Sequence, residues 1–308
     1  MEAYDVVIGT VFMDCKGFAA ADYDPAGRNV GTVKFIHGGV GRNVAENLAN
    51  LGESVLFVSS VDDTALGSEV EQKLKARGVD LSCIKRLPTA GMGIWLVIID
   101  ENGNLAGSVS QMPRLEALEA TICDKGDEII KNARSVLLEL DLNEKIAART
   151  IALAEKYGKA VYGITGNMQV ILKAPELLKK LECYICNETE AERLFGSPIP
   201  ESTDEIIKVL AAYLTEKELK SMIITLGERG SVWCRSVGER TEQGFCPVEA
   251  VRAVDTTGAG DAFFSGAITA LNKALSMQEA CLCGTKLALW TLAVEEPVCH
   301  ELPEELFR

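Results

Sequence analysis

The segment with the clearest chemical potential begins at Asp255 and reads Asp-Thr-Thr-Gly-Ala-Gly-Asp up to Asp261. An apolar helical pattern follows it, so Gly258, Ala259 and Gly260 would lie at a helix N-terminus, where unpaired N–H groups and the helix dipole favour an anion. Glycine allows a phosphate to approach such a backbone closely. Because a phosphate there would repel the carboxylate of Asp261, we interpret this residue as a general base that takes a proton from an attacking hydroxyl. A helix-stabilising role without chemistry is the alternative.

Glycines also gather at residues 37–45, which read His-Gly-Gly-Val-Gly-Arg-Asn-Val-Ala between a predicted strand and a predicted helix. Gly38 and Gly39 would allow a ligand to contact the backbone, and the Asn43 amide offers a donor and an acceptor to a pair of hydroxyl groups. The spacing approaches a dinucleotide-binding fingerprint, but Val44 stands where its third glycine belongs. The segment therefore predicts a site for a hydroxyl-bearing ligand, with a nicotinamide-dependent oxidoreductase as the alternative.

Polar side chains follow several other predicted strands. Asp14 follows the first strand, at the edge where open α/β sheets bind ligands, and an ordinary turn aspartate is the alternative. Asn187 and Glu190 have the spacing of a helix capping box, and residues 225–230 (Thr-Leu-Gly-Glu-Arg-Gly) predict a turn between a strand and a hairpin. The sequence contains no Walker A pattern, so the helix after Gly258 is left as the phosphate-binding element.

Strand-like apolar runs alternate with helical patterns along most of the chain, which is typical of a parallel sheet with crossover helices. Gly52 and Gly78 come just after two of the helical patterns, where a left-handed residue often ends a helix. The predicted elements are strands at 6–11, 55–61, 136–140 and 160–164, and helices at 44–51, 68–75 and 146–157.

Two stretches break the alternation. Residues 30–36 and 93–110 have the content of antiparallel strands, and the second contains a turn signal at residues 100–104. They predict a small second sheet, formed by two insertions at about residues 11–36 and 90–112, which would act as a discontinuous lid.

Length and composition limit the remaining classes of function. A chain of 308 residues, with 47% apolar residues, can bury the core of one large α/β domain. A net charge of −14 argues against a nucleic-acid surface, and we expect no membrane span because uninterrupted apolar runs are too short. The first residues lack a basic signal-peptide region, so we expect the cytoplasm, where the ten cysteines would stay reduced as small buried apolar residues. Their spacing is a poor match to a zinc site.

The two glycine-rich segments resemble the ribokinase, or PfkB, family of carbohydrate kinases. Its C-terminal signature, D-T-x-G-A-G-D, matches residues 255–261 completely. The resemblance implies that Asp261 is the catalytic base, that the backbone of residues 258–260 forms an anion hole, and that Asp255 and Thr257 lie near a monovalent cation such as K⁺. The N-terminal signature, G-G-x-G-x-N, implies that Gly38, Gly39 and Asn43 bind the phosphoryl acceptor.

The resemblance assigns further roles residue by residue. Asp14 would hold sugar hydroxyls, although Phe12 stands where the family commonly has asparagine, which favours an acceptor with an aromatic or apolar part. Glu190 would help to place a hydrated Mg²⁺, with Asn187 near the nucleotide phosphates. The remaining implied positions are Asp141 and Asn143 on the acceptor side, with surface loop residues as the alternative, and Thr225, Gly227 and Gly230 in the ATP-binding loop.

The resemblance covers nearly the whole chain. It implies one domain over residues 1–308, with a ribokinase-like three-layer α/β/α sandwich, a mostly parallel central sheet and a small β-sheet lid. The activity implied is ATP- and Mg²⁺-dependent phosphorylation of a primary, 5′-type hydroxyl of a sugar or nucleoside. The form G-G-V-G-R-N is closest to pseudouridine kinases, with ribose, other nucleosides and ketohexoses as alternatives. A non-catalytic sensor is a further alternative, because of Phe12 and of a missing Asp-Pro pair near Gly163. Exposed lid edges favour a homodimer.

Overall fold

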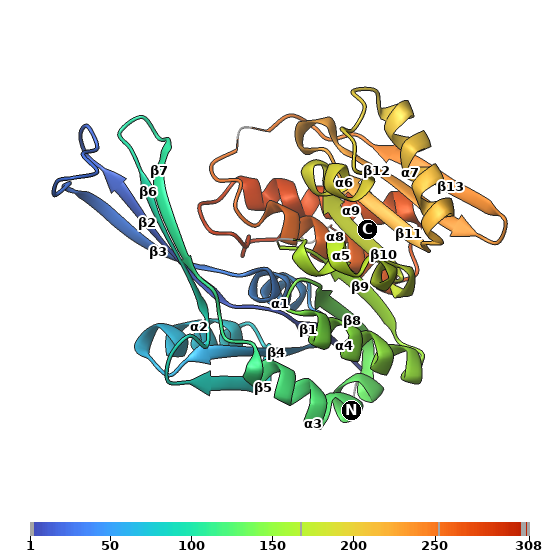
Figure 1. Ribbon diagram of the computed structural model, residues 1–308, viewed down its shortest axis with the longest axis horizontal. Coiled ribbons are helices and arrows are strands. Elements are labelled where there is room, and N and C mark those ends of the chain that lie inside the picture. The colour runs from blue at the N-terminus through green and yellow to red at the C-terminus, as the bar shows by residue number, and fades with distance from the viewer. Residues whose placement is uncertain (1–2, 167, 252, 303–305, 307–308) are drawn as a thin grey trace.

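The structure is a computed structural model in which residues 3–166, 168–251, 253–302 and 306 are described. These residues form a large sheet between two layers of helices, and a smaller sheet that extends away from this core (Figure 1). Among the described strands, no hydrogen-bonded pair joins the two sheets. The predicted three-layer α/β/α sandwich with a small separate sheet is therefore confirmed.

The large sheet is parallel over most of its width and antiparallel at one edge. Parallel strands bring their carboxyl ends to one edge of the sheet, where open α/β folds bind ligands. Within the described part of this sheet, the antiparallel pairs are those made by the last two strands in the chain. In spatial order the nine strands found in the described residues are β13 (Arg240–Cys246), β12 (Ser231–Val237), β11 (Ser221–Thr225), β10 (Cys183–Asn187), β9 (Ala160–Ile164), β8 (Ala133–Glu139), β1 (Tyr4–Ile8), β4 (Val55–Asp62) and β5 (Asp80–Leu87).

Helices cover both faces of this sheet, because side chains alternate along each strand. In β1, Val7 packs into one apolar cluster, while Val6 and Ile8 pack into the other. The cluster around Val7 contains α1 (Val40–Asn50), α2 (Ala65–Ala76), α8 (Ala259–Asn272) and α9 (Met277–Leu292). The opposite cluster contains α3 (Glu116–Asn132), α4 (Glu144–Tyr157), α5 (Gln169–Lys173), η1 (Pro175–Lys180), α6 (Glu188–Phe195) and α7 (Thr203–Lys217).

The smaller sheet, which we call the lid, has the order β3-β2-β6-β7. Its strands are β3 (Gly31–Gly38), β2 (Phe12–Ala19), β6 (Gly93–Ile99) and β7 (Leu105–Gln111). The turn between β6 and β7 lies where the residue types at 100–104 predict it. The predicted antiparallel strands are present, because β3 pairs antiparallel with β2 and β7 pairs antiparallel with β6, while β2 and β6 pair in parallel. Both β2 and β6 leave the core at the edge formed by the carboxyl ends of the parallel strands, so they run in the same direction.

The remaining local predictions are mostly confirmed. Gly52 and Gly78 have φ angles of 81° and 86°, as expected for residues that end helices. Helix α1 begins four residues earlier than predicted, at Val40, because the glycine pair at residues 38–39 leads directly into its first turn. All ten cysteines are free and eight of them are buried, but Cys15 is half-buried and Cys123 is exposed. In the part of the chain that the structure describes, no helix is both long and apolar enough to cross a membrane.

Candidate active site

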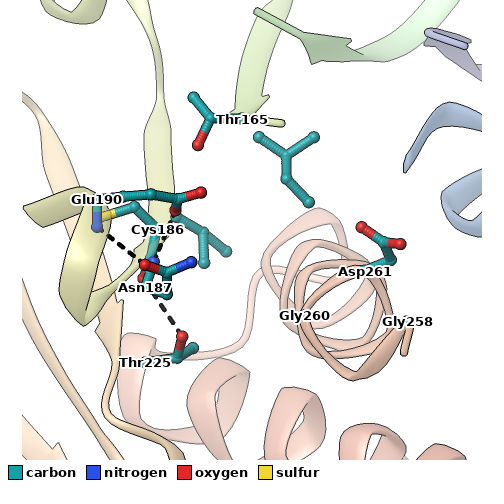
Figure 2. Close-up of a pocket in the computed structure, with 10 residues that line it drawn as sticks. Thr165, Cys186, Asn187, Glu190, Thr225, Gly258, Gly260 and Asp261 are labelled. Carbon is teal, nitrogen blue, oxygen red and sulfur yellow. Dashed lines mark hydrogen bonds between the residues drawn. The ribbon is translucent and has the colours of Figure 1, made fainter. Parts of the chain in front are cut away.

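The N-terminus of α8 forms one wall of a pocket at the carboxyl edge of the large sheet. Gly258, Gly260 and Asp261 line this wall, and Figure 2 shows them at the end of the helix. The opposite wall carries Asn187, Glu190 and Thr225, from the ends of β10 and β11 and the first turn of α6. The structure thus brings together residues that lie in three separate parts of the sequence. The other lining residues are Ile164, Thr165, Ile185 and Cys186.

The two glycines at the start of α8 have different physical reasons to be glycine. Gly258 caps the helix with a φ angle of 80°, and a Cβ atom there would lie 2.1 Å from the carbonyl oxygen of Pro297. A Cβ atom on Gly260 would meet no atom within 4 Å, although this residue lines the pocket. Gly258 therefore fixes the turn into the helix, while Gly260 keeps space free beside it. The arrangement suits the anion hole that the sequence predicts.

Asp261 is held at the pocket by a hydrogen bond from helix α1. The Asn43 amide nitrogen Nδ2 donates to Oδ2 of Asp261 at 2.6 Å. Burial raises the pKa of Asp261 to about 7, and the carboxylates of Glu139 and Glu190 add to this rise, while the Asn43 hydrogen bond opposes it. A carboxylate with this pKa can accept a proton near neutral pH and release it again, as a general base must.

Asn43 also has an unused acceptor. The residue is 3% exposed, and its oxygen Oδ1 has no hydrogen-bond partner among the described residues. A buried polar atom without a partner costs free energy, unless a ligand or water supplies one. A ligand hydroxyl that donates to Oδ1 would remove this cost next to Asp261. Asn43 is thus placed where it could bind a ligand hydroxyl, and this role remains a prediction.

The lid carries Asp14, the first of the predicted acceptor residues. Asp14 of β2 is 7% exposed, and its carboxylate faces Gly38, where an added Cβ atom would lie 3.0 Å from Oδ2. Burial raises the pKa of Asp14, while Lys16 and Arg42 oppose the rise. Gly39 has a φ angle of 98°, and a Cβ atom there would lie 2.7 Å from the backbone nitrogen of Phe12. This close approach explains the glycine pair between β3 and α1.

Phe12 itself packs over the backbone of the neighbouring lid strand. A Cβ atom added to Gly93 would lie 2.3 Å from the Phe12 ring atom Cε1. Trp95 lies in register with Asp14 in the adjacent strand, so the two side chains share one face of the lid. Aromatic side chains therefore flank the position of Asp14.

Two predicted acceptor residues have structural partners of their own. Asp141 accepts hydrogen bonds from the backbone nitrogens of Gly166 and Val170, at 3.1 Å and 3.3 Å. The Asn143 side chain caps α4 by accepting from the backbone nitrogen of Ile146 at 2.8 Å. These contacts order the loop after β8, and a direct role for either residue toward an acceptor remains a prediction.

Asn187 and Glu190 form the predicted capping box at the start of α6. The Asn187 side chain accepts from the Glu190 backbone at 2.9 Å, and the Glu190 carboxylate accepts from the Asn187 backbone at 2.8 Å. Burial raises the pKa of Glu190, although the hydrogen bonds from Asn187 and Thr165 oppose this. In the described residues, no three metal-ligating side chains cluster together. One fixed carboxylate at the pocket fits a magnesium ion that keeps most of its waters.

The predicted ATP-binding loop forms the turn between β11 and β12. Gly227 and Gly230 have φ angles of 58° and 92°, and a Cβ atom on Gly230 would lie 2.2 Å from the carbonyl oxygen of Cys246. Thr225 reaches the pocket, and its hydroxyl donates to the Cys186 carbonyl oxygen at 3.4 Å. The two glycines shape the turn next to the pocket.

Asp255 and Thr257 lie in the loop before α8, and a lid lysine contacts both of them. Asp255 Oδ1 accepts from the Thr257 backbone nitrogen at 2.8 Å. Lys16 Nζ lies 3.1 Å from Asp255 Oδ2 and 3.4 Å from the Thr257 hydroxyl. Burial alone would raise the pKa of Asp255, but Thr257 and Lys16 hold it below its usual value.

The sequence patterns did not point to Lys16 or to Glu139. Glu139, at the end of β8, is 8% exposed and accepts from the Thr10 backbone nitrogen at 2.7 Å and from the Thr10 hydroxyl. Burial raises its pKa, while hydrogen bonds from Thr10 and Gly41 oppose the rise. A carboxylate near the end of an apolar strand was the available signal for Glu139. Nothing in the pattern around Lys16 indicates its partner.

The protein combines a mostly parallel α/β core with a separate lid, and a carboxylate lies next to a helix N-terminus at its pocket. Together these features define a phosphotransferase that acts on a hydroxyl group. Comparison with known proteins agrees. The model for the pfkB family carbohydrate kinases matches residues 3–299, and the chain belongs to this family.

Relatives in this family act on different acceptors. The chain is 35% identical to guanosine-inosine kinase of Exiguobacterium acetylicum, over 94% of each chain. It is 26% identical to pseudouridine kinase of Escherichia coli (strain K12), over 85% of this chain and 82% of the relative. The structure of Arabidopsis thaliana ribokinase, complexed with ribose and ATP, superposes with a TM-score of 0.80 at 24% identity, over 96% of this chain and 94% of that one. This last likeness concerns the fold.

Proposed function

We propose that residues 1–308 act as a single kinase domain that transfers the γ-phosphoryl group of ATP to the primary, 5′-type hydroxyl of a nucleoside. The acceptor hydroxyl would donate its proton to Asp261 and attack the phosphoryl group, which the N-terminus of α8 binds. The bond between the γ-phosphorus and the bridging oxygen breaks, and ADP leaves. Mg²⁺, placed by water-mediated contact with Glu190, would offset the charge of the phosphates.

The observation that carries this proposal is the pairing of Asn43 with Asp261. One amide group holds the carboxylate through Nδ2 at 2.6 Å and offers a buried, unpartnered Oδ1 beside it. An alcohol that donates a hydrogen bond to the Asp261 carboxylate or to Asn43 Oδ1 would be oriented next to the anion hole of α8. Positioning of this kind accounts for a large part of phosphoryl-transfer catalysis.

A nucleoside is favoured over a simple sugar by the aromatic residues near Asp14. Phe12 and Trp95 lie on the same face of the lid as this carboxylate. If the ribose of a nucleoside bound through Asp14 and Asn43, the base of that nucleoside would lie near the Phe12 and Trp95 rings. These rings can pack against the aromatic face of a base. A free ribose would leave the same apolar surface uncovered.

Two nucleosides lead as acceptors, for different reasons. A purine nucleoside is favoured by the 35% identity with guanosine-inosine kinase, which covers 94% of each chain. Pseudouridine is favoured by the segment Gly-Gly-Val-Gly-Arg-Asn at residues 38–43 and by the 26% identity with pseudouridine kinase. We place inosine and guanosine first, because the identity is higher and extends over more of the chain.

The deciding experiment is ADP release from MgATP with a panel of acceptors. The panel contains inosine, guanosine, pseudouridine, uridine, ribose, fructose and fructose phosphates, and Asp261→Asn serves as the control enzyme. One strong nucleoside acceptor that the variant fails to phosphorylate would support the proposal. Preference for ribose or fructose would refute a nucleoside kinase, and ATP binding without turnover on any acceptor would favour a sensor.

We also propose that the protein forms a homodimer through the outer face of the lid. Register places Val33, Phe35, Leu96 and Val109 together on the face opposite Asp14. These side chains are 61%, 60%, 43% and 68% exposed. Two copies that each carry a net charge of −14 repel one another, and an apolar face lets them meet where little charge is present.

A further inference from the structure

The loop before α8 holds a positive charge that belongs to the protein itself. Lys16 projects from the middle of lid strand β2, two residues after Asp14 and on the same face. Its side chain is 12% exposed, and its ammonium group forms an ion pair with Asp255 at 3.1 Å. These two residues are 239 positions apart in the sequence, so the contact joins the lid to the loop that leads into the anion hole.

This contact affects the site at which a monovalent cation is expected. Asp255 has one oxygen engaged by the Thr257 backbone and the other by Lys16. The Thr257 hydroxyl lies 3.4 Å from the same ammonium group. A potassium ion bound to Asp255 would therefore lie beside a fixed, largely buried positive charge, and like charges at such a distance repel strongly. The residues present do not fit an added monovalent cation.

We propose that Lys16 replaces the monovalent cation at this loop, so that the enzyme works without K⁺. The ammonium group supplies the charge that balances Asp255, and it orders the turn at residues 255–257 through two contacts. Since this turn leads directly into Gly258, Lys16 acts as a positioning residue for the anion hole and not as a group that touches the reacting atoms. The proposal rests on the phosphate-binding role assigned to the N-terminus of α8.

The lid contains a matched control for this lysine. Lys34 of β3 pairs in register with Lys16, so both ammonium groups extend from the same face of the lid. Lys34 forms its own ion pair with Glu295 at 2.7 Å, but both partners are exposed, at 50% and 70%. Removing either lysine deletes one lid charge and one ion pair between lid and core. Among the described residues, only the loss of Lys16 removes the cationic partner of Asp255.

The first test compares turnover in potassium chloride with turnover in choline chloride of equal ionic strength. We expect the wild-type kcat to be nearly equal in the two salts. Lys16→Met should lose about tenfold or more of kcat in choline, with a small change in the KM of the acceptor, and K⁺ or NH₄⁺ should restore part of the loss. Lys34→Met and Lys16→Arg should show no response to K⁺.

A second readout needs no activity. Ions that bind the folded state raise its melting temperature, so K⁺ should raise the Tm of Lys16→Met above its value in choline and leave the wild-type Tm unchanged. The proposal fails if wild-type turnover requires K⁺, if K⁺ specifically stabilises the wild-type protein, or if Lys16→Met and Lys34→Met respond alike. The wild-type measurements decide the question even if Lys16→Met does not fold, and the Tm measurements remain valid if no acceptor is turned over.

Discussion

At the scale of single residues, the candidate site contains a carboxyl group whose pKa lies close to neutral pH. Asn43 donates to Asp261, and burial raises the pKa of this carboxyl group to about 7. A lower pKa would make Asp261 a weaker base, and a much higher pKa would leave it protonated at neutral pH. Burial and the Asn43 amide act in opposite directions, and their balance places the group where proton transfer is efficient.

Replacement of Asp261 by asparagine should separate catalysis from folding. We expect Asp261→Asn to lower kcat by about a hundredfold to ten-thousandfold, the usual contribution of a general base, while the affinity for ATP changes little. Kinetics and ATP binding by calorimetry would measure both effects. Substantial remaining activity would exclude Asp261 as the base.

The same variant should be more stable than the wild type at alkaline pH. The pKa of Asp261 rises from 3.8 to about 7 in the folded protein, so the unfolded state loses this proton first as the pH increases. The charged carboxylate therefore lowers the free energy of unfolding progressively between these two values, and the deficit persists above them. Asparagine carries no charge, and we expect Asp261→Asn to have the higher Tm at about pH 8, measured by circular dichroism. An equal or lower Tm would contradict this account.

The pH dependence of the reaction should report the same carboxylate. For a base that titrates at about 7, kcat/KM for the acceptor falls about tenfold for each pH unit below that value, because only the ionised form accepts the proton. Initial rates at saturating MgATP, from about pH 5 to pH 8, would give the profile. A flat profile over this range would mean that proton transfer does not involve this group.

At the scale of elements, the N-terminus of α8 combines a fixed turn with an open surface. Gly258 must be glycine because of its positive φ angle and the nearby Pro297 backbone, whereas Gly260 faces open space. The two positions should therefore respond to the same methyl group in different ways.

Gly258→Ala should mainly reduce stability, and Gly260→Ala should mainly reduce turnover. The first change forces a strained φ angle and a backbone collision, which should cost more than about 2 kcal/mol in the free energy of unfolding. The second should be neutral or slightly stabilising, since alanine favours helices, but its methyl group would occupy part of the phosphate pocket and lower kcat. Urea denaturation and kinetics would separate the two effects.

Gly52→Ala provides the control for the strained φ angle. Gly52 has a φ angle of 81°, and a Cβ atom there meets no atom within 4 Å, so only the conformational cost applies. We expect Gly258→Ala to be more destabilising than Gly52→Ala. Equal effects would show that contact with Pro297 contributes nothing.

The sequence predicted elements that depend on local patterns and missed contacts that depend on the fold. The capping box at Asn187 and Glu190 needs only a spacing of three residues, and it was predictable. Strand β2 has no clean alternation of apolar and polar residues, and it is a strand because it pairs with neighbours on both sides. The contact between Lys16 and Asp255 joins distant segments, and a single sequence gives no measure of such proximity.

At the scale of the whole molecule, the lid has two chemically different faces. One face carries Asp14 and the two lysines toward the core, while the other exposes apolar side chains. Such an exposed apolar face is unusual unless it is covered in the functional state. The division follows from the alternation of side chains along β2 and β3.

Charge on the outer face should separate the proposed dimer into monomers. Phe35 is 60% exposed there, and Phe35→Asp would place carboxylates against one another across a two-fold interface. We expect the wild type to sediment as a dimer and this variant as a monomer. Leu282→Asp on α9, where the leucine is 40% exposed, is the control and should leave the dimer intact. A wild-type monomer at micromolar concentration would refute the interface.

The absence of hydrogen-bonded pairing between the two described sheets divides the molecule into parts that can diverge separately. The proposal assigns phosphoryl transfer to the core, at the end of α8, and much of the contact with the acceptor to lid strands. Substitutions in the lid, other than at Lys16, can accumulate without disturbing the base or the anion hole. Descendants of one ancestral kinase can thus acquire new acceptors while keeping the same catalytic apparatus, as the different acceptors named for its relatives illustrate.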